Sequence, residues 1–404
     1  MQMAQVNIAP IEGLVSELWD RGGTDIHIGA GAPPMMRIDG DLYPVAGHDP
    51  LHPDDIERLA EAMLPEEMLE QFVRTRQVDF SFSWKDVTRF RGNIFRQRGA
   101  VSLALRAIPF QIPTMEELLL PPVMETFCQQ RQGLVLMTGP TGSGKSTTQA
   151  AMVGTINDTM RRHILTLEDP IEYVHGHNLS LVSQREIGFD TATFQDGLRS
   201  ALREDPDVVL VGEMRDPESI ATTLTIAETG HLVFATLHTN DASSAIDRII
   251  DVFPSDRQSQ IRVQLAASLS GVVAQRLVPR VGGGMIAAFE ILLANNAIRA
   301  LIREGKTHQI RNVISQSVRE GMQTLEQSLS VLVAHGLITY EEAVVRAVVP
   351  KEVRGAPAPQ HWDPNQPPPE GGMVPPPEGG VYAPDAAGAF VPAAPPGSGQ
   401  APPA

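Results

Sequence analysis

Nine consecutive residues, 139–147 of this 404-residue chain, have the types and spacing that bind phosphate groups. They follow an apolar run at 134–137 and lead into a helix-compatible stretch. Glycine lets the backbone turn its N–H groups around anionic oxygens, and the amino end of a helix adds partial positive charge. Every required position of the P-loop pattern is filled, which predicts that Lys145 reaches the β- and γ-phosphates of ATP and that Ser146 holds Mg²⁺. The predicted nucleotide contacts are Gly139, Pro140, Thr141, Gly142, Ser143, Gly144, Lys145, Ser146 and Thr147.

Acidic residues follow two further strand-like runs. Glu168, Asp169 and Glu172 come after the run at 165–167, and Glu213 comes after 208–211 and a glycine. Mg²⁺ and the attacking water lie beside the γ-phosphate, so acids are needed where strands next to the P-loop end. Many P-loop enzymes use an Asp-Glu pair for these two tasks, but Gly212 takes the place of the Asp here. We predict Glu172 as the base that activates water and Glu213 on the Mg²⁺ side. An exchange of roles among Glu168, Glu172 and Glu213 is equally compatible with the sequence, as are capping or surface roles for Glu168 and Asp169.

Two histidines flank another apolar run at 232–237. His231 and His238 are seven residues apart, too far for a one-turn helical metal pair, and no third ligand is evident. Because the P-loop belongs to the same region, we predict that both are catalytic and bind phosphate or the acidic residues. A structural role at the strand ends is the alternative.

Arginines crowd two predicted strands of the amino-terminal region. So many arginines on two strands are unexpected in an acidic chain. One interpretation is that they bind the γ-phosphate, as arginine at a domain boundary can. A solvated strand face is the other. These arginines are Arg89, Arg91, Arg96, Arg98 and Arg106.

The composition excludes several classes of protein. Lysine plus arginine total 32 against 48 acids, and this net charge of −16 disfavours a general nucleic-acid binder. Cys128 is the single cysteine, so the chain cannot form an internal disulfide or a cysteine-built zinc site, which suits a reducing compartment. The first residues lack the layout of a signal peptide, and no apolar run approaches the ~20 residues of a spanning helix. We expect a cytoplasmic protein without direct membrane insertion.

The order of apolar and helical patterns predicts two folded domains and a tail. Residues 1–108 alternate helices and strands as an α+β domain does, and 109–132 form a proline-containing linker with an entry helix. Apolar runs at 133–290 alternate with helical stretches, which predicts a P-loop α/β domain with a buried parallel sheet. Residues 291–350 read as mostly helical. At 351–404 Pro, Gly and Ala dominate, so we expect a disordered tail, with a polyproline ligand as the alternative.

Four blocks together resemble the secretion ATPases of type II secretion and type IV pili. They are the P-loop at 139–146, the acidic segment at 164–173, the strand ending at Glu213 and the histidine segment at 228–240. The resemblance runs from about Thr24 to Val348 and is closest to the pilus retraction branch. Assembly-type relatives usually carry a four-cysteine zinc module, which this chain cannot form. Segments typical of the retraction branch lie at 24–28, 33–37, 297–304, 305–310 and 321–324.

The resemblance implies a homo-hexamer of PAS-like amino-terminal domains joined to RecA-like ATPase domains, with ATP bound between the two domains. It implies that Arg91 and Arg106 extend to the nucleotide and that 297–304 corresponds to a segment tied to retraction. Ala300 departs from the asparagine usual there, and the proline-rich tail is not part of the family pattern.

The predicted function is that of a Mg²⁺-dependent ATPase motor for pilus retraction and twitching motility. It would act on an inner-membrane platform protein and lie at the inner face of the cytoplasmic membrane, with a paralogous retraction ATPase as a further partner. A motor for pilus assembly or type II secretion is one alternative. Another is a nucleotide-sensing partner of low turnover, against which the presence of Lys145, Glu172 and Glu213 argues. A RecA-type nucleic-acid motor is disfavoured by the excess of acids.

Overall fold

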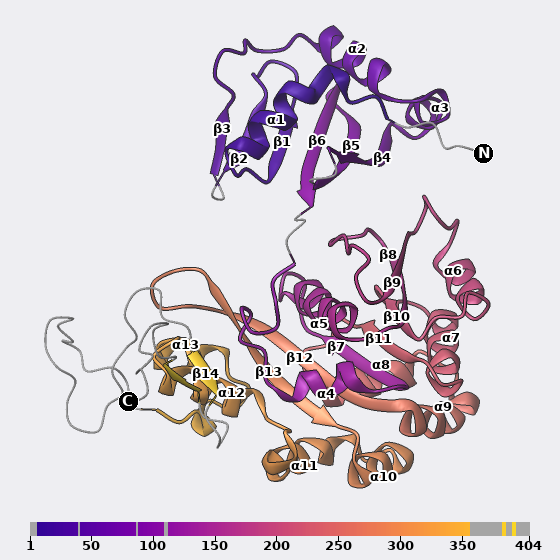
Figure 1. Cartoon of the computed structure of the whole chain (residues 1–404), viewed down its shortest axis with the longest axis vertical. Helices are drawn as coiled ribbons and strands as arrows, with labels where there is room; N and C mark the ends of the chain where they lie inside the picture. Colours follow the sequence, from indigo (N-terminus) through magenta and orange to yellow (C-terminus); the bar gives the residue numbers. More distant parts are fainter. Residues whose placement is uncertain are drawn as a thin grey trace, which may run out of the picture. The chain divides into compact units, whose positions relative to one another are not determined.

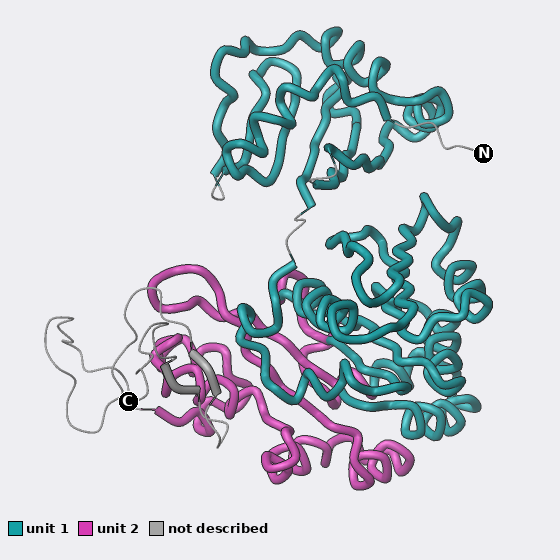
Figure 2. Tube along the Cα trace, viewed as in Figure 1, with its two compact units in different colours: residues 1–137, 144–237, 247–271 teal, residues 138–143, 238–246, 272–404 magenta. Residues whose placement is uncertain are grey.

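A computed structural model describes residues 6–38, 41–85, 88–108, 112–355, 382–384 and 390–392. The chain divides into two units that interleave along the sequence (Figure 2). Unit 1 comprises residues 1–137, 144–237 and 247–271, and unit 2 comprises 138–143, 238–246 and 272–404.

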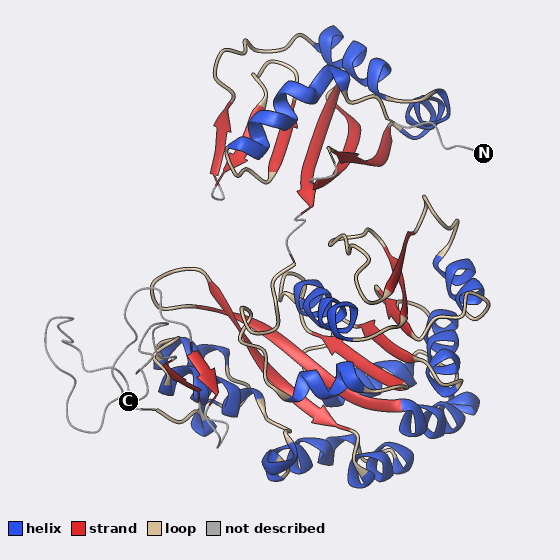
Figure 3. Ribbon diagram, viewed as in Figure 1, coloured by secondary structure: helices blue, strands red, loops and turns tan. Residues whose placement is uncertain are grey.

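The amino-terminal part of unit 1 is a six-stranded antiparallel sheet with helices on one face (Figure 3). Its strand order is β3-β2-β1-β6-β5-β4. Side chains alternate between the two faces of a strand, so Phe90 and Ile94 are buried in the core while Arg89 and Arg91 lie on the other face. The predicted α+β domain is therefore confirmed. Its elements are α1 (Glu12–Asp20), β1 (Asp25–Ile28), β2 (Met35–Ile38), β3 (Asp41–Pro44), α2 (Pro53–Met63), α3 (Glu66–Thr75), β4 (Gln77–Trp84), β5 (Thr88–Gln97) and β6 (Ala100–Ile108).

The rest of unit 1 is built on a parallel sheet whose strands run in the order β7-β11-β10-β8-β9 (Figure 1). All residues of β7, β10 and β11 are buried, as expected for strands covered on both faces. The predicted P-loop α/β domain is confirmed. The strands are β7 (Gly133–Thr138), β8 (His163–Glu168), β9 (Leu181–Glu186), β10 (Val208–Val211) and β11 (Leu232–Thr236). The helices are α4 (Val123–Gln129), α5 (Lys145–Thr159), α6 (Phe194–Ala201), α7 (Pro217–Glu228) and α9 (Ser255–Ser268).

Most of unit 2 follows residue 271. Strand β13 lies beside β12, and helices follow. The buried carboxylate of Glu326 on α12 accepts hydrogen bonds from Arg311 and from the backbone N–H groups of Val348 and Val349, and so holds the carboxyl-terminal segment. The elements are α8 (Ala242–Asp251), whose last residues belong to unit 1, β12 (Leu269–Pro279), β13 (Met285–Leu293), α10 (Asn296–Glu304), α11 (Ile310–Gln316), α12 (Leu325–Ala334) and α13 (Tyr340–Arg346).

Several element predictions need correction. Strand β13 runs past residue 290, where we expected helices to begin, and β9 and β12 were not predicted as strands. Within 291–350, which we expected to be mostly helical, residues 307–320 form a short α-helix between two 3₁₀ turns. The next helix starts at Leu325, because Thr324 and Gln327 cap it reciprocally.

The predicted tail lies mostly outside the described residues. Two three-residue strands in it, β14 (Tyr382–Pro384) and β15 (Phe390–Pro392), pair antiparallel. In the described parts of the chain, no helix combines the length and the apolar character that crossing a bilayer would take.

Candidate active site

The phosphate segment has the backbone that its glycines predict. Gly139, Gly142 and Gly144 have φ values of 144°, 77° and 83°, in the left-handed half of conformational space. A Cβ at Gly139 would lie 2.3 Å from the carbonyl oxygen of Gln275, so a side chain there would displace the backbone. Helix α5 begins directly after Gly144, and because its N-cap is a glycine, no side chain covers its amino end. Such an end is a ready site for an anion.

Lys145 lies close to both predicted acids. It is 7% exposed, and burial lowers its pKa while the carboxylates of Glu213 and Glu172 act in the opposite direction. The three residues come from different elements of unit 1: the start of α5, the residues after β10 and the loop after β8. The structure therefore brings together the lysine and the two carboxylates that the sequence singled out.

Gly212 explains why this chain has one acid after β10 where related sites have two. A Cβ at Gly212 would lie 3.0 Å from the carbonyl oxygen of Leu167 and 3.2 Å from the Cα of Glu168. Because β8 and β10 are neighbours, a side chain at this position would require the end of β8 to shift by a few tenths of an ångström, which favours glycine. Glu213, the next residue, forms an ion pair with Arg215 at 2.8 Å.

Glu168 and Glu172 have different environments. Glu168 Oε1 accepts hydrogen bonds from the Thr166 hydroxyl at 2.6 Å and from Gln184 Nε2 at 3.2 Å, and burial of its carboxyl raises its pKa to about 7. Glu172 is exposed and acts on Lys145. The exposure of Glu172 and its effect on Lys145 favour it over Glu168 as the base for water.

Mg²⁺ fits the oxygen donors present. Ser146 follows Lys145 directly, and Glu213 supplies a carboxylate close to that lysine. Across the described residues, no group of three or more His, Cys, Asp and Glu side chains is placed to hold a metal. Mg²⁺ does not need such a cage, because it keeps several waters and binds phosphate oxygens beside one or two protein ligands.

The two histidines lie in different places. Thr239, next to His238, accepts a hydrogen bond from the Thr138 hydroxyl at 2.6 Å, so the histidine segment is joined to the residue that precedes Gly139. His231 instead precedes β11, and its Nδ1 lies 3.0 Å from the carbonyl oxygen of Ile226 at the end of α7. The five residues of β11 separate the two ends of the strand by about 16 Å. Within one chain, His231 therefore lies at the amino end of β11, opposite to the carboxyl ends of the strands that carry the acids, and its catalytic role stays a prediction.

Three of the five predicted arginines, Arg89, Arg91 and Arg106, share one face of the amino-terminal sheet. Arg96 lies on the helix-covered face, over the ring of Phe72, and Arg98 follows the end of β5. Arg91 and Arg106 are directly opposite each other on β5 and β6, and both are exposed. Arg106 Nε binds Asp25 Oδ1 at 2.7 Å, and although burial opposes it, hydrogen bonds from Thr24 and Arg106 lower the pKa of Asp25. Arg89 lies 3.3 Å from Glu186 on β9. Like charges opposite each other destabilise a sheet, so the Arg91–Arg106 pair favours an anion as its partner.

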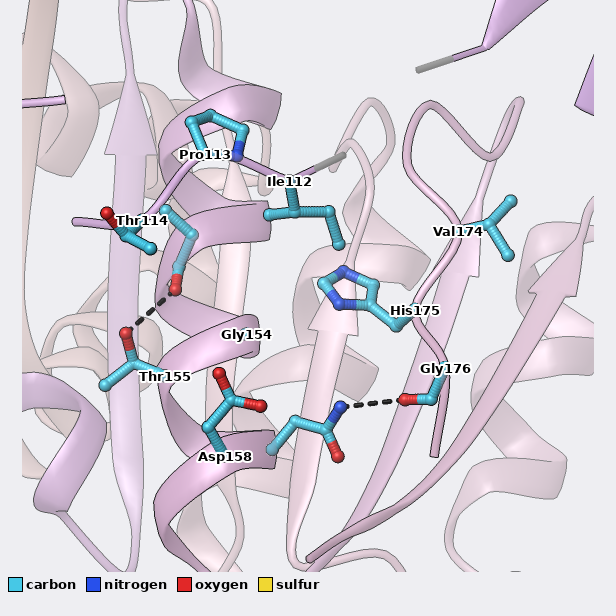
Figure 4. A pocket seen from close by; sticks show the side chains of 11 residues that line it. Ile112, Pro113, Thr114, Gly154, Thr155, Asp158, Val174, His175 and Gly176 are labelled. Carbon is cyan, nitrogen blue, oxygen red and sulfur yellow. Dashed lines mark hydrogen bonds between the residues drawn. The ribbon is translucent and has the colours of Figure 1, made fainter. Parts of the chain in front are cut away.

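A cavity of about 240 Å³ lies beside α5 but contains none of the predicted site residues (Figure 4). It is lined by 112–114, by the second half of α5 and by 174–176. Burial lowers the pKa of His175, in its wall, to about 4, so this imidazole is neutral at physiological pH. Sequence reasoning also missed Gln184 and the hydroxyl of Tyr173, because their contacts depend on which strands and helices become neighbours.

This chain is similar to known proteins in both sequence and fold. The type II/IV secretion system protein family matches residues 100–285. The type IV pilus retraction ATPase PilT of Pseudomonas aeruginosa is 47% identical over 331 residues, which cover 82% of this chain and 96% of PilT. A twitching motility protein of Neisseria gonorrhoeae is 46% identical, with 78% and 84% of the two chains covered. The crystal structure of the pilus retraction motor PilT with bound ADP superimposes with a TM-score of 0.80 at 48% identity, covering 85% of this chain and 98% of the other.

Proposed function

We infer the function from family and site together: this chain belongs to the type II/IV secretion ATPases, and within them to the type IV pilus retraction ATPases. It is an ATPase. We propose that it works as a hexamer whose ATP hydrolysis drives pilus retraction through an inner-membrane platform protein, at the inner face of the cytoplasmic membrane. The observation that carries this proposal is the convergence of Glu172 and Glu213 on the buried Lys145 beside the glycine-lined phosphate segment.

Each residue of the site has a proposed role. Lys145 binds the β- and γ-phosphate oxygens together with the backbone N–H groups of 139–146. Glu172 accepts the proton of the water that attacks the γ-phosphorus. Ser146 and Glu213 would hold Mg²⁺, which neutralises charge on the phosphate oxygens. His238 is proposed to bind a phosphate oxygen, because its neighbour Thr239 is hydrogen-bonded to Thr138, the residue before Gly139.

Arg91 and Arg106 are proposed to bind the phosphates from the amino-terminal domain. Two guanidinium groups held opposite each other, with Asp25 paired to only one of them, leave a net positive charge on an exposed surface. Guanidinium groups stabilise the charge that develops on transferring phosphoryl oxygens. His231, bound to the end of α7, has no proposed part in the site of its own chain.

Two matched variants test the role of Glu172. Glu172→Gln removes the base but keeps the size of the side chain, so kcat should fall by about 100-fold or more while ATP still binds. Glu168→Gln is the control, because that carboxyl is already engaged by Thr166 and Gln184, and it should cost less than about tenfold. Steady-state phosphate release and binding of a fluorescent ATP analogue measure the two effects. Normal turnover of Glu172→Gln would remove it as the base.

A further inference from the structure

The loop that carries Glu172 is not held by helix or strand hydrogen bonds of its own. Residues 169–180, between β8 and β9, have no regular secondary structure. Irregular backbone next to a sheet needs other partners for its polar groups. The carboxylates of Glu186 and Glu168 accept from the backbone N–H groups of Ile171 and Glu172. Beyond Glu172, two side-chain amides bind the loop backbone, one from β9 and one from α5.

Gln184 on β9 binds the loop just after Glu172. Its Nε2 donates to the carbonyl oxygen of Tyr173 at 2.8 Å, and its Oε1 accepts from the backbone N–H of His175 at 2.7 Å. The same Nε2 donates to Glu168 Oε1 at 3.2 Å. Both ends of the amide are therefore occupied. This one side chain makes the two backbone hydrogen bonds, at residues 173 and 175, that a neighbouring strand would otherwise make. This arrangement fixes the orientation of the amide as well as the path of the loop.

Tyr173 is held at a second point. Its hydroxyl lies 2.8 Å from Oγ1 of Thr147, which directly follows Ser146 at the start of α5. The main chain of Tyr173 is thus bound to β9 through Gln184, and its ring is bound to the helix that begins at the phosphate segment. Glu172 is the residue immediately before Tyr173, so these contacts hold the backbone next to Glu172.

Asn157 binds the far end of the same loop in the same manner. Its Nδ2 donates to the carbonyl oxygen of Gly176 at 2.8 Å, drawn in Figure 4, and its Oδ1 accepts from the backbone N–H of Asn178 at 3.2 Å. Two amides therefore make the same pair of hydrogen bonds to the loop, one at residues 173 and 175 and one three residues further along, at 176 and 178. Only Gln184 also binds Glu168. Asn157 is a matched control for Gln184.

We propose that Gln184 is a positioning residue for ATP hydrolysis, acting through Tyr173 to hold the Glu172 carboxylate where it meets the attacking water. This proposal rests on the role of Glu172 given above. Gln184 does not touch the nucleotide in this account, so it contributes to kcat and not to ATP affinity. A displacement of about 1 Å in a catalytic group costs about 100-fold in rate.

Two variants that keep side-chain shape separate positioning from general packing. Gln184→Met and Asn157→Leu each remove one amide and two hydrogen bonds to the loop. We expect Gln184→Met to lower kcat by about 10- to 100-fold with KM for ATP within about threefold of wild type. Asn157→Leu should lower thermal stability to a similar extent but keep kcat within about threefold. A wild-type kcat in Gln184→Met, or equal kcat losses in both variants, would overturn the proposal.

A third measurement asks whether Gln184 acts through Glu172. In a Glu172→Gln background, Gln184→Met should cause less than about a twofold further loss, because residues that act as one unit are not additive. A full further loss would show another route and refute the positioning role. If Glu172→Gln itself keeps normal turnover, the proposed base is wrong instead, so the two failures are distinguishable. If Gln184→Met does not fold, Gln184→Asn decides, because its shorter amide cannot reach both Tyr173 and His175: a severalfold loss of kcat supports the proposal, and an unchanged kcat contradicts it.

Discussion

The buried carboxyl of Glu168 should make the stability of this protein depend on pH in a way that one substitution removes. Burial raises its pKa from 4.5 to about 7, so the folded protein keeps a proton that the unfolded chain loses between these values. The unfolded state then binds fewer protons than the folded state, and the free energy of unfolding falls as pH rises through this window. Below about pH 4.5 both states are protonated and the penalty is absent.

The magnitude follows from the two pKa values. The full penalty above pH 7 is about 3 kcal/mol, because one pKa unit corresponds to about 1.4 kcal/mol. Between pH 5 and pH 8 the linkage relation gives a loss of about 2 to 3 kcal/mol from this group. Glu168→Gln carries no titrating group here, and its amide oxygen can still accept hydrogen bonds from Thr166 and Gln184.

The assay is urea unfolding of wild type and Glu168→Gln at pH 5, 6, 7 and 8. Any effect of the substitution on the free energy of unfolding that does not depend on pH is the same at every pH. It therefore cancels when the difference in unfolding free energy between the two proteins is compared across pH. Relative to wild type, the variant should gain about 2 to 3 kcal/mol of stability from pH 5 to pH 8. A difference that does not change with pH, or that changes in the opposite direction, would refute the assignment of a protonated, buried carboxyl.

Three further substitutions test the site. Lys145→Ala should abolish Mg²⁺-dependent ATP hydrolysis, measured by phosphate release, and turnover that survives would place the nucleotide elsewhere. Gly139→Ala should weaken nucleotide binding by at least about tenfold in a titration with fluorescent ADP, because its Cβ would lie 2.3 Å from the carbonyl oxygen of Gln275. Wild-type affinity would mean that nucleotide binding does not depend on the backbone conformation of Gly139. Arg91→Ala should lower kcat at least about tenfold while the melting temperature stays within a few degrees. A wild-type rate would mean that Arg91 only forms part of a solvated strand face.

The sequence was sufficient for the parts of the site that depend on local pattern. The glycine spacing predicted the phosphate segment, and the apolar runs before Glu213 and Glu172 predicted acids at strand ends, since a buried parallel strand has a recognisable composition. Strand β9 was missed because Leu181-Val182-Ser183-Gln184-Arg185-Glu186 is largely polar and lies at the edge of the sheet. An edge strand has one paired side and needs no continuous apolar run.

The sequence does not show which strands and side chains become neighbours in the folded protein. Glu168 and Glu172 are four residues apart and look interchangeable, and they separate only because β8 pairs with β9 in the register that sets Thr166 opposite Gln184. The register of β5 and β6 likewise sets Arg91 opposite Arg106. His231 was placed in the site by its nearness in sequence to His238, but a strand carries its two ends to opposite edges of the sheet. Contacts of this kind come from tertiary pairing and leave no local signal.

The most direct test of the motor function is to count pili on cells in which the gene for this chain encodes Glu172→Gln. If ATP hydrolysis by this protein retracts pili, these cells should carry more pili than wild-type cells and should not move by twitching. Cells without pili would contradict the account, because they would show that hydrolysis at this site assembles the filament.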